Sequence, residues 1–221
     1  MGTAKVVPSA SEIGRRRRLA FDKGSQTYQE RRREIARVAA QIFNQRGFKG
    51  TSLVAVANAL GADRASLYYY IANKRDLFDV VIREVSESNV EMAESVLATG
   101  LPALDKLRKL VIELMRSYGG NYPLLYVYVR ENLSHVESDR TEWSQHMRTV
   151  NRRYDDAIIA VMQEGIDDGS IRPIASARVL AFGVLGMINW TNRWFVPDRS
   201  PDTADEIGMA YAEMVVAGLR A

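Results

Sequence analysis

The chain of 221 residues is 47% hydrophobic and 26% charged, a composition that excludes a disordered or fibrous protein. It contains no cysteine, which excludes disulfides and thiolate metal sites. The longest apolar run, Val179 to Ile188, is far shorter than the roughly 18 to 20 residues of a membrane helix, and the N-terminus lacks a signal-peptide segment. We therefore expect a cytoplasmic protein without a membrane partner.

The positive charge is concentrated near the N-terminus. Residues 1–50 hold twelve Lys and Arg against four Asp and Glu, whereas residues 51–221 hold eighteen against twenty-three. Four consecutive arginines, Arg15, Arg16, Arg17 and Arg18, form one cluster, and residues 31–33 form a second. Such clusters are expected in a segment that meets phosphates; the alternative is a solvated basic tail.

The first helix is predicted after an irregular arm. Residues 1–26 lack periodicity and carry Gly, Ser, Pro and Arg, which predicts a flexible segment. From Ile35 to Phe43 the apolar residues follow the helical i, i+3, i+4, i+7, i+8 spacing. Gly47 is expected to end this helix.

Two short helices are predicted next. Thr51 and Ser52 are N-capping residue types before a helix over residues 53–60, and Gly61 suits a tight turn after it. Asp63 is expected to cap a third helix, with a fourth a few residues beyond. Two short helices joined by a Gly-containing turn and packed on a longer helix form a helix-turn-helix.

The remainder of the chain is also helical in pattern, with no strand signal. Apolar residues from Leu104 to Tyr118 and from Trp143 to Val161 alternate spacings of three and four, as in helical bundles. We therefore predict an all-α fold with a helix-turn-helix domain over residues 27–78 and a C-terminal bundle over residues 79–221.

Residues 51–78, TSLVAVANALGADRASLYYYIANKRDLF, resemble the DNA-binding signature of the TetR family of transcriptional regulators. That signature has a Thr opening the second helix, an apolar-Ala pair, a turn Gly, a Leu-Tyr pair and a Lys before the fourth helix. Here these positions are Thr51, Val56-Ala57, Gly61, Leu67-Tyr68 and Lys74. Two departures, Leu60 for Ala and Asp63 for Ser or Thr, leave the assignment intact.

The resemblance implies a ligand-released homodimeric repressor that binds a palindromic operator, is not an enzyme, and needs no cofactor or metal. It implies that Tyr68, Tyr70 and Lys74 contact phosphates. It also implies that Thr51 or Ser52 uses the N-terminus of the second helix as an anion site.

Helix geometry predicts which way each side chain points in the third helix, which contains the Leu-Tyr pair and is the recognition helix of the family signature. With Leu67 facing inward and about 100° per residue, Ile71 shares its face, whereas Ala65 and Tyr69 face away. Small exposed residues let the helix enter the major groove, where Ser66 can bond to almost any base edge and Arg64 prefers guanine. The predicted DNA-binding residues are Thr51, Ser52, Arg64, Ala65, Ser66, Tyr68, Tyr69, Tyr70 and Lys74, with Arg15 to Arg18 of the arm.

The flanking tyrosines leave an alternative open. Tyr68 and Tyr70 can reach phosphate oxygens with their hydroxyl groups, which would position the helix without reading sequence. Tyr70 lies only about 60° from Leu67 around the helix, so it can instead pack inside the domain.

The C-terminal bundle is expected to dimerise and to bind a small apolar or amphipathic effector. Residues 175–220 resemble the helix pair that forms the family's dimer interface; the alternative is an internal hairpin. Segment 101–168 is expected to enclose the effector, although aromatics at helical spacing also occur as plain core. Candidate lining residues are Tyr118, Tyr122, Tyr126, Tyr128, Trp143, His146 and Met147.

INWTNRWFVP, residues 188–197, is similar to a stretch of family members that regulate lipid or sterol breakdown and respond to acyl-CoA thioesters. This similarity implies that Arg193 is an anion partner and that Trp190 or Trp194 is a stacking surface. An interface role is the alternative for these three side chains.

The competing function is an enzyme or small-molecule carrier with an incidental basic tail. The only histidines, His135 and His146, match no metal motif, and no phosphate-binding Gly loop or nucleophile elbow is present. A nonspecific DNA-binding protein is a third class, which would show no sequence preference.

Overall fold

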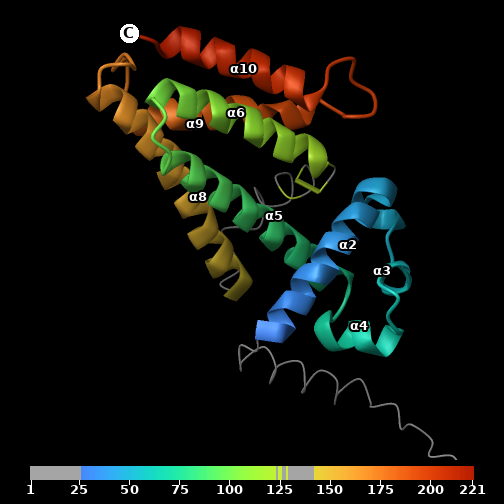
Figure 1. The fold of residues 1–221 in the computed structure, drawn as a ribbon. Coiled ribbons are helices and arrows are strands. Elements are labelled where there is room, and N and C mark those ends of the chain that lie inside the picture. Colours follow the sequence, from blue (N-terminus) through green and yellow to red (C-terminus); the bar gives the residue numbers. More distant parts are fainter. Residues whose placement is uncertain (1–25, 123, 126–127, 129–141) are drawn as a thin grey trace, which may run out of the picture. The chain divides into compact units, whose positions relative to one another are not determined.

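In this computed structural model, the residues described are 26–122, 124–125, 128 and 142–221. They are mainly helical, with one isolated antiparallel bridge between Ile171 and Arg220 and no strand in these ranges (Figure 1). The predicted all-α class is confirmed. The chain divides into two compact units, residues 1–84 and 85–221. This division and the predicted boundary after residue 78 both fall within one continuous helix.

The first unit begins with a helix longer than its apolar stripe. Helix α2 (Gln26–Gly50) starts nine residues before Ile35, where the stripe begins. Gly47 interrupts it at φ 67° and ψ 170°, a left-handed conformation that suits glycine. The interruption lies where the sequence predicts the helix to end.

The helix-turn-helix is confirmed. Helices α3 (Leu53–Ala59) and α4 (Arg64–Tyr70) pack on α2 and on each other. Gly61, at φ 61°, lies in the turn between them. Leu67 and Ile71 are 1% and 0% exposed, so the anchor predicted from helix geometry is also confirmed.

The second unit is a bundle that includes the C-terminal part of α5 (Lys74–Leu97). Its other elements are α6 (Ala103–Gly120), α8 (Glu142–Asp167), α9 (Ala177–Trp190), the 3-10 turn η1 (Thr191–Arg193) and α10 (Ala204–Leu219). No helix in the described ranges has the length and apolar character needed to cross a membrane.

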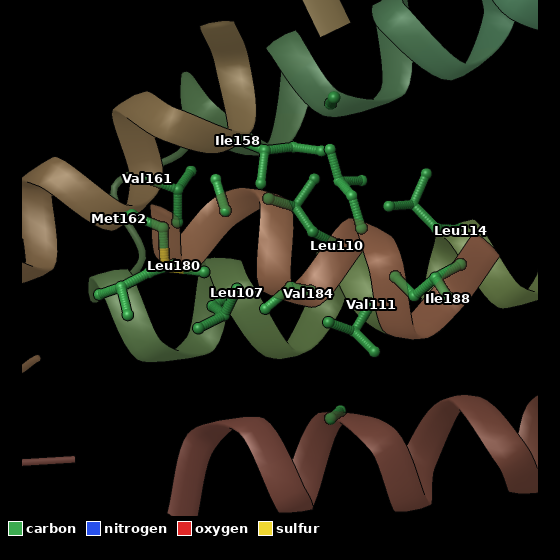
Figure 2. Packing of buried hydrophobic residues seen from close by; sticks show 14 of the residues in the cluster. Leu107, Leu110, Val111, Leu114, Ile158, Val161, Met162, Leu180, Val184 and Ile188 are labelled. Carbon is green, nitrogen blue, oxygen red and sulfur yellow. The ribbon is translucent and has the colours of Figure 1, made fainter. Parts of the chain in front are cut away.

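The core of the second unit lies where α6, α8 and α9 meet. Figure 2 shows their side chains interdigitating at the helical spacings of three and four that the sequence displays. These residues are Leu107, Leu110, Val111 and Leu114 of α6, Ile158, Val161 and Met162 of α8, and Leu180, Val184 and Ile188 of α9.

Glycine lets α10 approach α6 closely. A Cβ atom at Gly119 would lie 2.6 Å from the Cβ of Ala204, and one at Gly208 would lie 3.2 Å from the Cα of Ile112. One face of α10 is therefore held against α6.

Candidate DNA interface and ligand cavity

The first turn of α4 presents three exposed residues, Arg64, Ala65 and Ser66. Asp63 caps this turn by accepting the Ser66 N–H at 2.7 Å, and it also accepts the Ser66 hydroxyl at 2.8 Å. Arg64 Nη2 donates to Tyr68 Oη at 3.3 Å, and its guanidinium lies 5.3 Å from the centroid of that ring. The polar side chains at this end of the helix are therefore held in place by contacts within the protein.

The three consecutive tyrosines are all half-buried. The ring of Tyr69 meets the buried Tyr28 ring edge to face at 5.8 Å, and the ring of Tyr70 lies 5.1 Å from the same partner. The geometry of α4 alone predicts that Tyr69 faces away from the domain. In the structure, its ring instead packs against Tyr28 in the first turn of α2. Tyr28 is a residue that the sequence pattern did not single out.

Thr51 and Ser52 lie in different environments. Thr51 is 3% exposed and donates its hydroxyl to the Gly47 carbonyl at 2.9 Å, so it closes the break in α2. Ser52 is exposed, and its Oγ caps α3 by accepting the Ala55 N–H at 3.1 Å. Of these two predicted DNA-binding hydroxyls, only that of Ser52 lies at the surface.

Residues at the start of α5 hold the segment that follows α4 in place. Asp76 accepts the Ala72 N–H at 2.7 Å and pairs with Arg32 of α2 at 3.2 Å. Lys74 Nζ donates to the Lys49 carbonyl at 3.1 Å and lies 4.5 Å from the ring centroid of Phe48. The Lys74 side chain therefore lies against the half-buried Phe48 ring while its ammonium group binds the end of α2.

The three arginines of the second cluster, residues 31–33, each form an ion pair with a carboxylate of the protein. Arg31 pairs with Glu34 at 2.5 Å, Arg32 with Asp76 at 3.2 Å, and Arg33 with Glu84 at 3.8 Å. The first cluster, Arg15 to Arg18, lies outside the described residues.

A cavity of about 440 Å³ lies in the second unit among α5, α6, α8 and α9. Of the predicted ligand residues, Tyr118 and Tyr128 line it, and Tyr126 lies outside the described residues. The other described lining residues are Ser86, Asn89, Leu114, Leu125, Val150, Asn151, Tyr154, Asp155, Phe182, Leu185, Gly186, Ile188 and Asn189.

The remaining bundle candidates lie near the cavity lining without belonging to it. Tyr122 packs against the Tyr118 ring at 6.4 Å, and Trp143 against the Tyr128 ring at 6.5 Å. Met147 is buried. His146 Nε2 lies 2.8 Å from Glu87 Oε1, which ties α8 to α5.

The end of α9 carries an exposed cation and two tryptophans. The Arg193 guanidinium lies 5.2 Å from the Trp190 ring, and Trp190 and Trp194 are 62% and 47% exposed. None of the three belongs to the cavity lining. Their surroundings are those of a surface rather than of an internal ligand site.

The polar lining of the cavity is mostly uncharged, with Asp155 as its carboxyl group. Burial raises the pKa of this carboxyl, Asp156 raises it further, and Arg178 opposes both effects. Burial also raises the pKa of the Tyr154 hydroxyl, which therefore stays protonated at neutral pH. Across the described ranges, no group of three or more His, Asp or Glu could hold a metal ion.

One face of α9 is apolar and exposed. Val179, Phe182 and Trp190 are 60%, 39% and 62% exposed, and Gly183 and Gly186 lie at the surface between them. A Cβ atom at either glycine would meet nothing within 4 Å, so their backbone is open to close approach. On α10, Met209 and Met214 are also exposed. The name α9 face is used below for Val179, Phe182, Gly183, Gly186 and Trp190.

Two family models match the chain. One, described as bacterial regulatory proteins of the tetR family, matches residues 35–81, which include α3 and α4. The other, described as the tetracyclin repressor-like C-terminal domain, matches residues 100–219 and so covers more than half of the chain. The chain belongs to the TetR family. It is a DNA-binding transcription regulator, as the signature at residues 51–78 predicts.

Relatives of this TetR-family chain include named repressors. It is 26% identical over 190 residues to the HTH-type transcriptional repressor KstR2 of Rhodococcus jostii (strain RHA1), which covers 86% of this chain and 91% of the relative. The fold matches the ketosteroid transcriptional regulator KstR2 of Mycobacterium tuberculosis, with a TM-score of 0.67, 21% identity, and 86% and 95% of the two chains covered.

A further solved structure is AibR in complex with isovaleryl coenzyme A and operator DNA. It matches with a TM-score of 0.62 and 25% identity, covering 83% of this chain and 97% of AibR.

Some features of the cavity and of α4 in this TetR-family protein cannot be predicted from its sequence. Asn89, Asn151 and Asn189 line the cavity from three different helices, and no local pattern marks them as a group. Asp63 is expected from the sequence as a cap, but its second bond, to the Ser66 hydroxyl, is visible only in the structure.

Proposed function

We propose that the protein is a homodimeric repressor that binds a palindromic operator through α4 and leaves it when a small apolar or amphipathic ligand occupies the cavity. The main support for this proposal is that a single helix, α5, connects the end of α4 with the cavity. This helix begins at Lys74, just after α4, and contributes Ser86 and Asn89 to the cavity lining. Lys74 and Ser86 are roughly 18 Å apart at 1.5 Å per residue. A ligand that moves α5 would therefore move the exit of the recognition helix.

The DNA contacts follow from the exposed end of α4. Arg64, Ala65 and Ser66 would face base edges, because the N-terminal residues of a recognition helix enter the major groove. Tyr68, Lys74 and Ser52 would contact phosphates, which set the register of the helix on DNA. Arg15 to Arg18 would follow the phosphates or enter the adjacent minor groove.

The α9 face supports dimerisation. An exposed apolar stripe with two open glycines suits close packing against the same stripe of a second copy, since a two-fold interface pairs a surface with itself. Two copies would present two recognition helices to half-sites about one helical turn apart. Phe182 and Gly186 belong both to this face and to the cavity lining, so ligand binding can also affect the interface.

The ligand is proposed to be lipid-derived, either a sterol or an acyl thioester. The lining supports an apolar molecule through Leu114, Val150 and Leu185, with neutral amide and hydroxyl groups for its polar end. The relatives named for ketosteroid regulation and for an isovaleryl coenzyme A complex point in the same direction. The protein would then act in the cytoplasm on genes of lipid or sterol metabolism or efflux.

Two measurements test the proposal. Retention of genomic fragments at moderate salt should select a palindromic sequence, and fatty acids, sterols or CoA esters should release it. In a thermal-shift screen, a ligand at 100 times its dissociation constant should add about 2.7 kcal/mol of stability. Failure to retain any specific fragment contradicts the repressor function, and equal retention of all fragments indicates nonspecific binding.

A further inference from the structure

The hydroxyl proton of Ser66 already forms a hydrogen bond within the protein. Ser66 Oγ donates to Asp63 Oδ2 at 2.8 Å, while the Ser66 N–H donates to Asp63 Oδ1 at 2.7 Å. An ionised carboxylate only accepts hydrogen bonds, so the direction of the bond between the two side chains is set. What the exposed Ser66 hydroxyl offers outward is therefore its lone pairs.

The major groove distinguishes bases by the polarity of one central group. Adenine and cytosine present amino groups there, N6 and N4, which donate hydrogen bonds. Guanine and thymine present keto oxygens, O6 and O4, which accept them. A serine with a free proton can bind either class. A serine whose proton is held elsewhere can accept from an amino group but cannot donate to a keto oxygen.

We propose that Asp63 is a specificity-determining residue. By holding the Ser66 proton, it makes one operator position prefer an amino base, A or C, over a keto base, G or T, on the strand that Ser66 faces. Asp63 is a positioning residue, because it acts through Ser66 without contacting a base itself. The inference rests on the DNA-binding role proposed for α4.

Asp63→Asn should abolish this preference while keeping the helix capped. Asn caps helices as well as Asp does, so its Oδ1 can still accept the Ser66 N–H. Its Nδ2 only donates, and it would lie where Oδ2 now accepts the Ser66 hydroxyl. Ser66 Oγ would then accept from Nδ2 through one lone pair, which leaves its proton and its other lone pair available to a base. We expect G and T to be accepted as well as A and C, with the affinity for keto bases relative to amino bases rising roughly tenfold, the typical size of one base-pair mismatch.

Asp63→Ser is a second variant that should free the Ser66 proton in a different way. A serine Oγ can cap the Ser66 N–H. With one oxygen in place of two, it does not hold both groups of Ser66 as the carboxylate does, so the proton becomes free to rotate. The preference between amino and keto bases should then be lost, as in Asp63→Asn.

The experiment is operator selection from a randomised palindromic library by the full-length protein. Wild type, Asp63→Asn, Asp63→Ser, Ser66→Ala and the Asp63→Asn/Ser66→Ala double variant are compared. Base preference is the readout, because removing the Asp63 charge raises affinity for all DNA alike. In the Ser66→Ala background, Asp63→Asn should change no base preference, since its effect runs through the Ser66 hydroxyl.

Two outcomes overturn the proposal: an unchanged base preference in Asp63→Asn, or a change that persists without the Ser66 hydroxyl. If wild type selects no sequence at all, the DNA-binding function itself fails, so the two failures are distinguishable. Tyr68→Phe serves as a control, because removing a hydroxyl that binds phosphate should weaken binding to all sequences about equally.

Discussion

The ring of Tyr28 in the first turn of α2 lies edge to face against the ring of Tyr69 in α4, with centroids 5.8 Å apart and planes at 84°. Tyr70 packs on the same ring at 5.1 Å. The recognition helix is therefore supported near its C-terminal end by aromatic packing and capped at its N-terminal end by Asp63. The exposed residues of α4 are those of its first turn, Arg64, Ala65 and Ser66.

Replacing Tyr28 with Ala should destabilise the first unit. The ring is 4% exposed and supports two aromatic neighbours, so its removal should cost about 2 to 4 kcal/mol of unfolding free energy. Operator affinity should also fall by a similar factor for all sequences, because α4 loses its support. Tyr28→Phe keeps the ring and should retain most of the stability. Denaturant unfolding compares them, and equal destabilisation in both variants would contradict a packing role.

The stability of the first unit should fall as pH rises through the weakly acidic range. Burial raises the pKa of Asp79 to about 6, partly opposed by Arg75 and Arg83 and reinforced by Asp76. The folded state therefore holds this proton more tightly than the unfolded chain, whose carboxyl has a pKa of about 4. The resulting stabilisation is present below pH 4 and is lost as pH rises through 6.

Asp79→Asn isolates this effect. The variant should gain in melting temperature relative to wild type between pH 4 and pH 7, because a neutral amide avoids burying the charge. Asp105→Asn, an exposed carboxyl paired with Arg108, is the matched control. A difference between Asp79→Asn and wild type that stays constant with pH would contradict the raised pKa.

Adjacent glycines in α6 should respond differently to alanine. A Cβ at Gly119 would lie 2.6 Å from the Cβ of Ala204, so Gly119→Ala should separate α6 from α10 and cost about 1 to 3 kcal/mol. A Cβ at Gly120 meets nothing within 4 Å, so Gly120→Ala should be neutral or stabilise by up to about 1 kcal/mol. Thermal unfolding of the two variants decides, and equal effects would show that the close approach carries no stability.

A charge on the α9 face should prevent dimerisation. Val179→Glu places a carboxylate in the proposed apolar interface, and we expect monomers by light scattering and at least a tenfold loss of operator affinity. Leu101→Glu is a matched control, because Leu101 is also exposed, at 43%, and lies outside α9 and α10. A Val179→Glu protein that remains dimeric would place the interface elsewhere.

Removal of the N-terminal arm should weaken the salt dependence of DNA binding. If Arg15 to Arg18 bind phosphates, deleting residues 1–20 should reduce the slope of log affinity against log salt by about 0.9 for every phosphate that is no longer neutralised. Replacing the four arginines with Gln keeps the chain length and should have the same effect. An unchanged slope in both variants would mean that the arm is a solvated tail.

The amino-acid sequence is enough to predict the features that depend on neighbouring residues. The cap at Asp63, the turn at Gly61 and the anchor of Leu67 and Ile71 all follow from interactions within one or two helical turns. The all-α class and the family signature follow as well, because the apolar period and the spacing of a motif are properties of the chain.

Contacts between residues far apart in the sequence depend instead on how the helices pack. Tyr69 is predicted to face outward, but its ring packs against Tyr28, which lies forty-one positions earlier in the chain. The cavity brings Asn89, Asn151 and Asn189 together, whereas Trp190, close to the last of these in sequence, points to the surface. Helical periodicity predicts which residues share a face, but packing geometry decides what each face contacts.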